Sequence, residues 1–213
     1  MSYKKEVILS DLCSLSGESK YIYNKIKTFY DDFSKNNPKD MEIVINIIKS
    51  KYKLPVNTKD GNKMFKLSLR FLDEFITRYC SYYKIIIPVN TRYVRNDIFN
   101  IYIQYQARLK SHHKDYFDPF KRVKECDKFE FETNGFKFIT TLCQLNFFQW
   151  IIENDILKFI ENNLETIIKN KKEVDEYYKN IKNSKNKKDS QSTSSTQSIS
   201  SENRTKISFI LEL

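Results

Sequence analysis

The sequence predicts an α+β protein that is predominantly helical, with a small antiparallel hairpin sheet and a C-terminal strand as a candidate to complete it. Of 213 residues, 40% are hydrophobic and 15% aromatic, which is more buriable surface than a disordered chain carries. Only three Gly and four Pro are available for turns, which disfavours an all-β sandwich or barrel. One segment alternates with period two around Asn134-Gly135, the preferred pair for a two-residue hairpin turn.

Residues 1–83 are expected to form an N-terminal helical part. Apolar residues at helical spacing predict one helix from Ser19 to Ser34 and a second from Asp40 to Tyr52. A polar loop over Asn57 to Asn62 should follow. A stripe of i, i+3 and i+4 steps from Met64 to Tyr79 then predicts a third helix.

Residues 84–188 are expected to continue the same core with a basic segment, the hairpin and the C-terminal helices. Lys84 to Val89 is short and β-branched, and Pro88 makes it an edge strand or an extended connector. A fourth helix is predicted from Asn96 to Lys110.

The hairpin is the most informative local pattern. A two-residue loop at Asn134-Gly135 would pair Glu132 with Lys137 and Phe131 with Phe138, and both pairings are favourable. One face of the ribbon would then carry four aromatic rings, those of Phe129, Phe131, Phe136 and Phe138. Because a two-stranded ribbon is marginal alone, this face should rest on a neighbouring helix.

Two helices are predicted after the hairpin. Thr141 and Gln144 form the Thr-x-x-Gln pattern of a capping box, which predicts a helix from Leu142 to Glu153. Within it, Phe147-Phe148-Gln149-Trp150 places aromatics on successive positions, which is typical of a helix buried nearly all round. From Asp155 onward a clean apolar stripe predicts another helix.

The C-terminal part changes in composition. Lys169 to Asp189 holds eight Lys and should begin helical and then fray. A Ser/Thr-rich stretch within 189–203 has too little apolar surface to fold and is expected to be a disordered or phosphorylatable linker. Residues 204–213 read as a strand that could add to a sheet edge, either the hairpin or Ile85 to Ile87, or pair with another molecule.

The charge of the chain invites a nucleic-acid interpretation. The net charge is +10, and residues 84–128 carry 10 basic and 5 acidic groups, whereas 129–168 carry 2 and 6. Lys outnumbers Arg 30 to 7, which favours diffuse attraction over bidentate base readout. Aromatic and basic residues also interleave, a pattern that suits single-stranded nucleic acid. The candidate nucleic-acid-binding residues are Arg92, Arg95, Arg108, Lys110, Lys121, Arg122 and Lys124.

No catalytic or metal-binding signature emerges. Three isolated glycines exclude a P-loop. The adjacent pair His112-His113 points to different sides of a helix or strand, so both ligating one ion is not expected. The four cysteines lack Cys-x-x-Cys spacing and are expected to be reduced and mostly buried. Cys126 or Cys143 acting with His113 stays open in space, without a local signature for it. We therefore assign no catalytic residue, no metal and no cofactor.

The second half of the chain holds two distinctive blocks, Tyr116 to Arg122, reading Tyr-Phe-Asp-Pro-Phe-Lys-Arg, and Ile139 to Asn154, followed by the Lys-rich segment, the Ser/Thr run and the final strand. Together they resemble an uncharacterised protein family of nucleocytoplasmic large DNA viruses, with mimivirus-like and iridovirus-like members. The chain departs from the family where it has Cys143, Gln149 and Lys121 in place of Gly, Arg and Cys. Some iridovirus-like relatives carry an early-protein label. The resemblance implies a viral protein and no established activity.

These observations lead to a non-enzymatic viral protein of infected cells as the first hypothesis, binding DNA, RNA or a regulatory partner through residues 84–128 and the Lys-rich 169–188. The alternatives are a protein-interaction or virion-associated structural module, which could self-associate through its terminal strand, and an enzyme of unknown type. The start of the chain lacks a secretory signal and no apolar run reaches 18 residues, so we expect an intracellular protein without a membrane span. Host cytoplasm or viral factory is the expected location, with the virion as another option.

Overall fold

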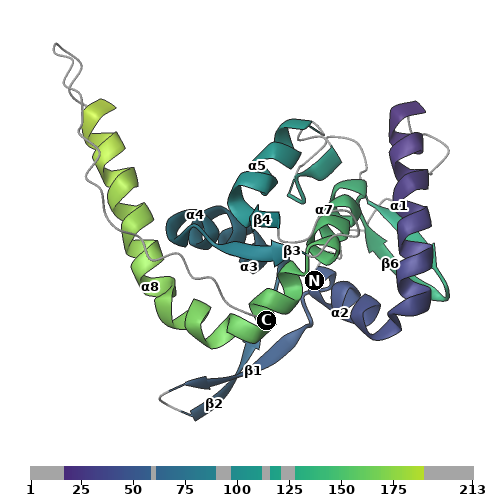
Figure 1. The fold of residues 1–213 in the computed structure, drawn as a ribbon, viewed down its shortest axis with the longest axis horizontal. Coiled ribbons are helices and arrows are strands. Elements are labelled where there is room, and N and C mark those ends of the chain that lie inside the picture. The colour runs from purple at the N-terminus through teal and green to yellow at the C-terminus, as the bar shows by residue number, and fades with distance from the viewer. Residues whose placement is uncertain (1–16, 59–60, 90–96, 112–115, 121–127, 190–213) are drawn as a thin grey trace, which may run out of the picture.

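Helices dominate the structure, a computed structural model that describes residues 17–58, 61–89, 97–111, 116–120 and 128–189 (Figure 1). The helices are α1 (Gly17–Asn36), α2 (Pro38–Ile48), α3 (Leu69–Glu74), the π-helix η2 (Phe75–Tyr79), α4 (Cys80–Tyr83), α5 (Ile101–Ser111), α7 (Leu142–Glu153) and α8 (Ile156–Asp189). The strands are β1 (Lys53–Thr58), β2 (Gly61–Lys66), β3 (Ile86–Val89), β4 (Asp97–Asn100), β5 (Phe129–Thr133) and β6 (Phe136–Thr140). They form three separate antiparallel pairs, β1–β2, β3–β4 and β5–β6. The predicted α+β, mostly helical class is confirmed.

Two hydrophobic clusters make up the core. The larger one gathers side chains from α2, α3, η2, α5, α7 and α8. The smaller one lies between α1, α2, the β5–β6 ribbon and α7. Helix α2 contributes Val44 and Ile47 to the larger cluster and Met41 and Ile45 to the smaller. Helices α2 and α7 therefore join the two clusters into one body.

Helix α7 is buried nearly all round, as its aromatic block predicts. Phe147 and Phe148 have no exposed surface and Trp150 is 2% exposed, and these three rings face the larger cluster. Leu145 faces the smaller cluster, and its carbonyl accepts a hydrogen bond of 2.9 Å from the buried Tyr30 hydroxyl of α1. The helix begins where expected, because the Thr141 hydroxyl accepts the Gln144 N–H at 3.1 Å.

The predicted β5–β6 hairpin is confirmed in turn and register. Glu132 is opposite Lys137 and Phe131 is opposite Phe138, with Asn134 at φ 43° and Gly135 at φ 83° in the turn. Lys137 makes its ion pair diagonally, with Glu130 at 3.1 Å. The aromatic face is buried against α1, where Tyr23 and Tyr30 contact it edge-on. This face thus rests mainly on α1, in addition to the α7 residue Leu145.

Buried polar groups fasten the hairpin turn to the end of α1. The Thr133 hydroxyl lies 3.0 Å from the Ser34 hydroxyl and donates to the Asp31 carboxylate at 2.8 Å. The Asn134 amide donates to the Asp31 carbonyl at 2.5 Å and to the Ser34 hydroxyl at 2.9 Å. Thr133 is 1% exposed and Ser34 is 2% exposed, so the contact between their hydroxyls satisfies groups that water cannot reach, whereas Asp31 and Asn134 are partly open to solvent.

Two sequence-based predictions about residues 53–79 are wrong. The expected loop over Asn57 to Asn62 is the turn of a hairpin, β1–β2, and the helix expected from Met64 begins only at Leu69. Ser68 caps that helix by accepting the Phe71 N–H at 3.3 Å. Met64 and Leu67 fit the helical spacing by coincidence, since Met64 lies on the strand and is 61% exposed.

The segment around β3 and β4 differs from expectation in one respect. Lys84 to Val89 does contain an edge strand, β3, which includes Pro88. The helix predicted from Asn96 starts later, at Ile101, because residues Asp97–Asn100 pair with β3 as strand β4. The Asn100 side chain then accepts the Ile103 N–H at 3.0 Å and so caps α5.

Residues other than glycine take left-handed backbone conformations at three element ends. Ser50 after α2 has φ 55°, Lys84 after α4 has φ 56°, and Asp155 between α7 and α8 has φ 51°. Such conformations are strained for residues with a Cβ atom. Glycine would adopt them without strain, but the chain has only three glycines, and none is at these positions.

The prediction that the helix frays within Lys169 to Asp189 is wrong, because α8 continues as a helix to Asp189. The Ser/Thr-rich linker and the terminal strand at 204–213 lie outside the described residues. In the part of the chain that the structure describes, no helix combines the length and apolar character needed to cross a membrane.

Replacing Thr133 by Val tests the fastening of the hairpin. The substitution keeps the shape of the side chain and removes its hydroxyl from one buried and one part-buried contact, so we expect a loss of about 1–2 kcal/mol in the free energy of unfolding, measured in urea. Thr28→Val, on the exposed side of α1, is the matched control and should stay within about 0.5 kcal/mol of the parent. Equal effects of the two substitutions would show that the buried hydroxyl is not important.

Candidate functional site

The long helix α8 divides into an anchored half and a projecting half. A stripe of buried side chains fixes the first half to the larger cluster, and it consists of Ile156, Phe159, Ile160, Leu164, Ile167 and Val174. Val174 is the last fully buried residue, and Tyr177, Tyr178 and Ile181 are half-buried. The 15 residues of α8 that follow Val174, up to Asp189, extend about 22 Å at 1.5 Å per residue. Figure 1 shows this end of α8 leading away from the body.

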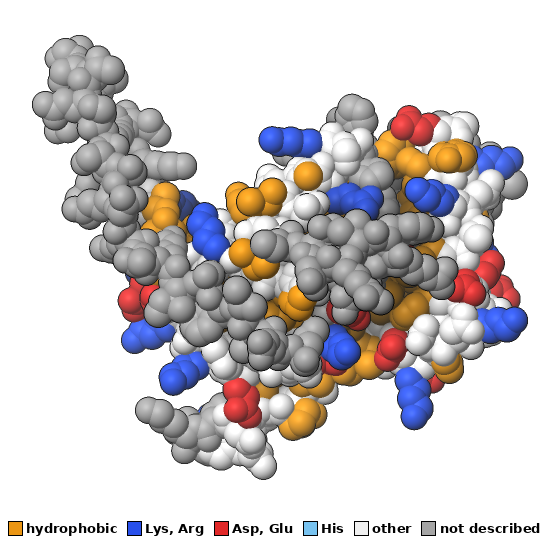
Figure 2. All heavy atoms as spheres, in the orientation of Figure 1, with side chains coloured by type: hydrophobic (Ala, Val, Ile, Leu, Met, Phe, Trp, Pro, Cys, Tyr) orange, Lys and Arg blue, Asp and Glu red, His pale blue; other side chains and the backbone are white. Residues whose placement is uncertain are grey.

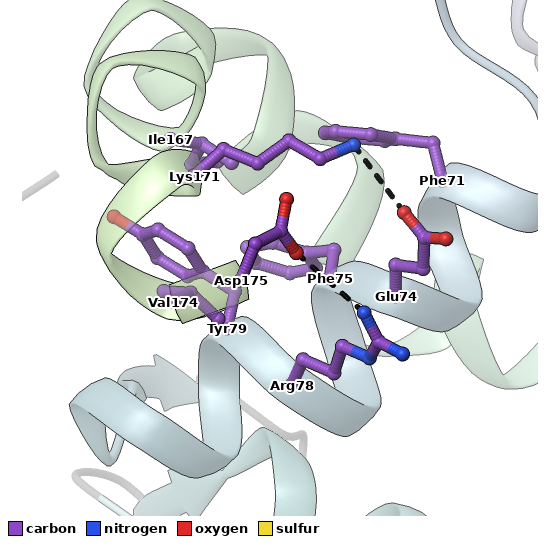
Figure 3. A pocket seen from close by; sticks show the side chains of 9 residues that line it. All are labelled: Phe71, Glu74, Phe75, Arg78, Tyr79, Ile167, Lys171, Val174 and Asp175. Atoms are coloured by element: carbon purple, nitrogen blue, oxygen red, sulfur yellow. Dashed lines mark hydrogen bonds and ion pairs between the residues drawn. The ribbon is translucent and has the colours of Figure 1, made fainter. Parts of the chain in front are cut away.

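Two ion pairs hold α8 against the last residue of α3 and against η2, where the anchored half ends. Lys171 contacts Glu74 at 3.3 Å, and Asp175 contacts Arg78 at 3.5 Å (Figure 3). Lys171 and Asp175 of α8 are four residues apart, as are Glu74 of α3 and Arg78 of η2, so only one orientation of α8 matches opposite charges. All four side chains are between 31% and 48% exposed, so water and salt weaken these pairs. The pairs therefore set the direction of α8 more than they stabilise the fold.

The cavity beneath these ion pairs is too small for a metabolite or cofactor. Phe71, Phe75, Tyr79, Ile167 and Val174 line it, and its volume is about 20 Å³. That is room for about one water molecule. A drug-sized ligand needs at least about 300 Å³.

Tyrosine hydroxyls strengthen the same contact. Tyr82 donates to one oxygen of Glu173 at 2.6 Å and Tyr83 donates to the other at 2.8 Å. Because both bonds favour the ionised form, they lower the pKa of the Glu173 carboxyl below its usual value of 4.5. Arg78 also lies over the Tyr178 ring at 5.8 Å. Glu173 and Asp175 are thus occupied by the body of the protein, whereas Glu176 lies 4.0 Å from Lys172 of its own helix.

The charge of α8 is concentrated in its projecting half. Residues 169–176 hold three Lys and three acids, which cancel, whereas residues 177–189 hold five Lys and one Asp, a net charge of +4. Lys179 and Lys182 are exposed and stand three residues apart, on neighbouring positions of the helix surface. Within residues 177–184, where the structure describes the side chains, no ion pair with the body neutralises Lys179 or Lys182.

The structure describes only two of the sequence-predicted nucleic-acid-binding residues. Arg108 and Lys110 are exposed in the last turn of α5, but two positions apart on a helix they point to opposite sides. The other five, Arg92, Arg95, Lys121, Arg122 and Lys124, lie outside the described residues, as do His112 and His113. In Figure 2 the Lys and Arg side chains are spread over the visible face, among acids, and form no single patch.

The interleaved aromatic residues near position 117 are structural. Phe117 is 1% exposed and packs against Tyr105, Phe147 and Trp150, so its ring is not accessible to a nucleic-acid base. Phe120 is 37% exposed and has Arg70 over its ring at 5.7 Å. Phe117 therefore anchors its segment on the core.

A larger groove lies between the α1–α2 and α7–α8 junctions. Its volume is about 270 Å³, and its lining combines apolar side chains with three acids, Asp40, Asp155 and Glu161, and one base, Lys158. The Tyr52 hydroxyl donates to Glu161 at 2.8 Å. The excess of acids makes this groove unsuitable for a polyanion. Among the described residues, no His, Cys or Ser lines either this groove or the cavity beside η2.

The described cysteines are not activated. Cys80 has no exposed surface, and burial raises the pKa of its thiol well above the usual value. Cys143 is 7% exposed in α7. Among the described residues, no three His, Cys, Asp or Glu side chains are grouped to hold a metal ion. Sequence reasoning placed these two thiols in the core, and the structure agrees.

Comparison with known proteins places the chain in a family. Residues 18–210 match the model of a family of unknown function, DUF7197, and the chain belongs to this family. The chain is also 33% identical over 163 residues to uncharacterized protein L507 of Acanthamoeba polyphaga mimivirus. The matched region covers 68% of this chain and 60% of the length of that relative. The resemblance to an uncharacterised family of large DNA viruses is therefore confirmed. No solved structure matches the chain.

The contact between Glu173 and the two tyrosines predicts a pH-dependent contribution to stability. Because the folded pKa is lowered, this contribution is complete above the usual pKa of 4.5 and is lost as the pH falls through the lower folded value. Glu173→Gln should therefore destabilise the protein by about 0.2–1 kcal/mol at pH 7, and the difference from the parent should shrink by pH 3, measured by urea unfolding at both pH values.

Glu176→Gln provides the matched control for this prediction. Glu176 is 65% exposed on the same helix and lies 4.0 Å from Lys172, so its replacement should change stability by less than that of Glu173 at pH 7. A Glu173 effect that persists unchanged at pH 3 would assign the difference to something other than the carboxylate.

Proposed function

We propose that this protein binds nucleic acid through the projecting, Lys-rich half of α8. The supporting observation is the uneven charge of one continuous helix, neutral over residues 169–176 and +4 over residues 177–189. A helix whose Lys residues extend from Lys179 to Lys188, about 14 Å along its axis, is suited to lie along a phosphate backbone or in the major groove of duplex DNA.

The chemistry of the cations indicates contact with phosphates and little reading of bases. All five basic residues of 177–189 are Lys, a flexible point charge, and none is Arg, the residue that pairs bidentately with guanine. Affinity should then come from the release of counterions and depend steeply on salt. The anchored half of α8 holds this cationic helix in a fixed direction through the ion pairs at Glu74 and Arg78.

The proposed function is that of a non-enzymatic viral binding protein. Arg108 and Lys110 on α5 are a second, weaker group of cations, and α5 and α8 both contact η2. The membership of a family with a mimivirus relative fits a role in infected cells. The alternative of a protein-interaction module predicts retention of a partner after nuclease treatment of an infected-cell extract, whereas the proposed function predicts its loss.

Binding of a 20-base-pair DNA duplex, followed by fluorescence anisotropy between 50 and 200 mM salt, tests the proposal. The double variant Lys179→Gln/Lys182→Gln should bind more weakly and reduce the slope of log K against log salt by about 1.8, that is, about 0.9 for each lost phosphate contact. Both side chains are exposed, so the fold should not change.

The matched control is Lys158→Gln/Lys172→Gln, which removes the same charge from the same helix. Lys158 lies by the acidic groove and Lys172 lies 4.0 Å from Glu176, so this variant should keep most of the salt slope. No binding at 50 mM salt, to duplex DNA or to single-stranded RNA, would refute the proposed function. Equal losses in both double variants would assign binding to net charge alone.

A further inference from the structure

The pairing of β1 with β2 determines which main-chain groups of this hairpin face outward. Pro55 is opposite Met64, and since proline has no N–H, this pair cannot exchange hydrogen bonds. In an antiparallel pair of strands, hydrogen-bonded and non-hydrogen-bonded residue pairs alternate. Three positions further along, the Leu67 N–H donates to the Tyr52 carbonyl at 3.1 Å, as this alternation requires if Pro55 and Met64 form a non-hydrogen-bonded pair. The main-chain N–H and C=O groups of Met64 therefore point away from β1.

The two outer edges of this hairpin are not equivalent. On β1, Pro55 has no N–H to offer, and the Asn57 N–H already donates to the Glu165 carboxylate of α8 at 3.2 Å. On β2, the outward groups belong to Asn62, Met64 and Lys66, and no described strand pairs with them. The β2 edge is thus a template for one more strand, whereas α8 and Pro55 close the β1 edge.

The faces of the hairpin show what side-chain pattern an added strand needs. Val56, at 3% exposed, lies on the inner face with Leu54 and Phe65, and all three pack on the larger cluster. Met64 lies on the opposite face and is 61% exposed. A third strand should therefore be apolar on the face that it shares with Phe65, where β2 also carries the exposed Lys63, and can place an apolar side chain beside Met64 on the other face.

We propose that residues 205–213 of the same chain, which lie outside the described residues, form the third strand of this sheet by pairing with β2. Their sequence alternates as the edge requires. One face would carry four large apolar side chains, those of Ile207, Phe209, Leu211 and Leu213. The other face would carry Lys206, Ser208, Ile210 and Glu212, so that Ile210 lies on the same face as Met64.

The connecting segment is long enough. Fifteen residues, 190–204, separate the end of α8 from Thr205, and extended they span up to about 50 Å. Glu165, which contacts β1, lies 24 residues before Asp189, about 36 Å back along the helix. The strand can therefore reach the β2 edge of its own molecule with length to spare.

The family comparison adds an independent observation. The family match runs to residue 210, beyond the end of α8, across the Ser/Thr-rich stretch and into the proposed strand. The terminal segment is thus part of what defines the family. A segment with four large apolar side chains also needs an apolar surface to cover it.

Met64→Pro tests this pairing with Met64→Ala as its control. Proline removes an N–H that the β1–β2 ladder does not use, as Pro55 does on the opposite strand, so it should block strand addition and leave the hairpin paired. By hydrogen exchange on the full chain, the backbone amides of residues 205–213 should be protected in the parent and in Met64→Ala, and exchange at least about tenfold faster in Met64→Pro.

Truncation after residue 203 is the second variant, and it does not alter the hairpin. The amides of Asn62, Met64 and Lys66 should exchange at least about tenfold faster in the truncated chain. The equivalent outward amides of the β5–β6 ribbon, those of Lys137 and Ile139, should not change. A change at Lys137 and Ile139 in place of β2, or no change at either edge, would overturn the proposal.

Sedimentation of the full and truncated chains completes the test. Because the strand adds to its own molecule, both chains should sediment as monomers. A dimer of the full chain that becomes a monomer on truncation would overturn the intramolecular pairing and assign the β2 edge to the strand of a second copy.

Discussion

The enclosure of α7 is the constraint on which the rest of the fold depends. A helix with Phe147, Phe148, Trp150 and Leu145 on different sides has no face to give to solvent, so it must be covered on both sides. The larger cluster covers one side, and α1 with the β5–β6 ribbon covers the other. The buried bond from the Tyr30 hydroxyl to the Leu145 carbonyl ties the second cover directly to the helix. The ribbon, marginal alone, is stable because it forms part of this cover.

Local patterns predicted the elements whose signals are contained in a few neighbouring residues. The Asn134-Gly135 turn and the cap at Thr141 are of this kind, and both are confirmed. The β1–β2 hairpin was missed because its strands mix Lys, Asn and Pro55 and owe their stability to contacts with α8 and the distant core, which no local window contains. Strand β4 was read as helix for a similar reason, since its pairing with β3 is a tertiary contact.

The candidate site could be anticipated only in composition. The Lys-rich run after residue 169 is visible in the sequence, but its division into a neutral anchored half and a cationic projecting half depends on which acids meet the body. Glu173 and Asp175 are engaged by Tyr82, Tyr83 and Arg78, residues about 90 to 100 positions earlier in the chain. Of the seven residues singled out from the sequence, Arg108 and Lys110 are exposed as expected, but they lie on opposite sides of α5.

The left-handed residues at element ends have a consequence for how this chain could be made more robust. Ser50, Lys84 and Asp155 each hold a conformation that costs a side-chain-bearing residue about 1 kcal/mol or more and that glycine adopts without strain. Replacing any of the three by glycine would remove this cost, and the greater freedom of glycine in the unfolded chain would offset part of the gain in stability. The free energy of unfolding of this glycine-poor viral protein could therefore be increased at its helix boundaries, at positions separate from the Lys-rich half of α8.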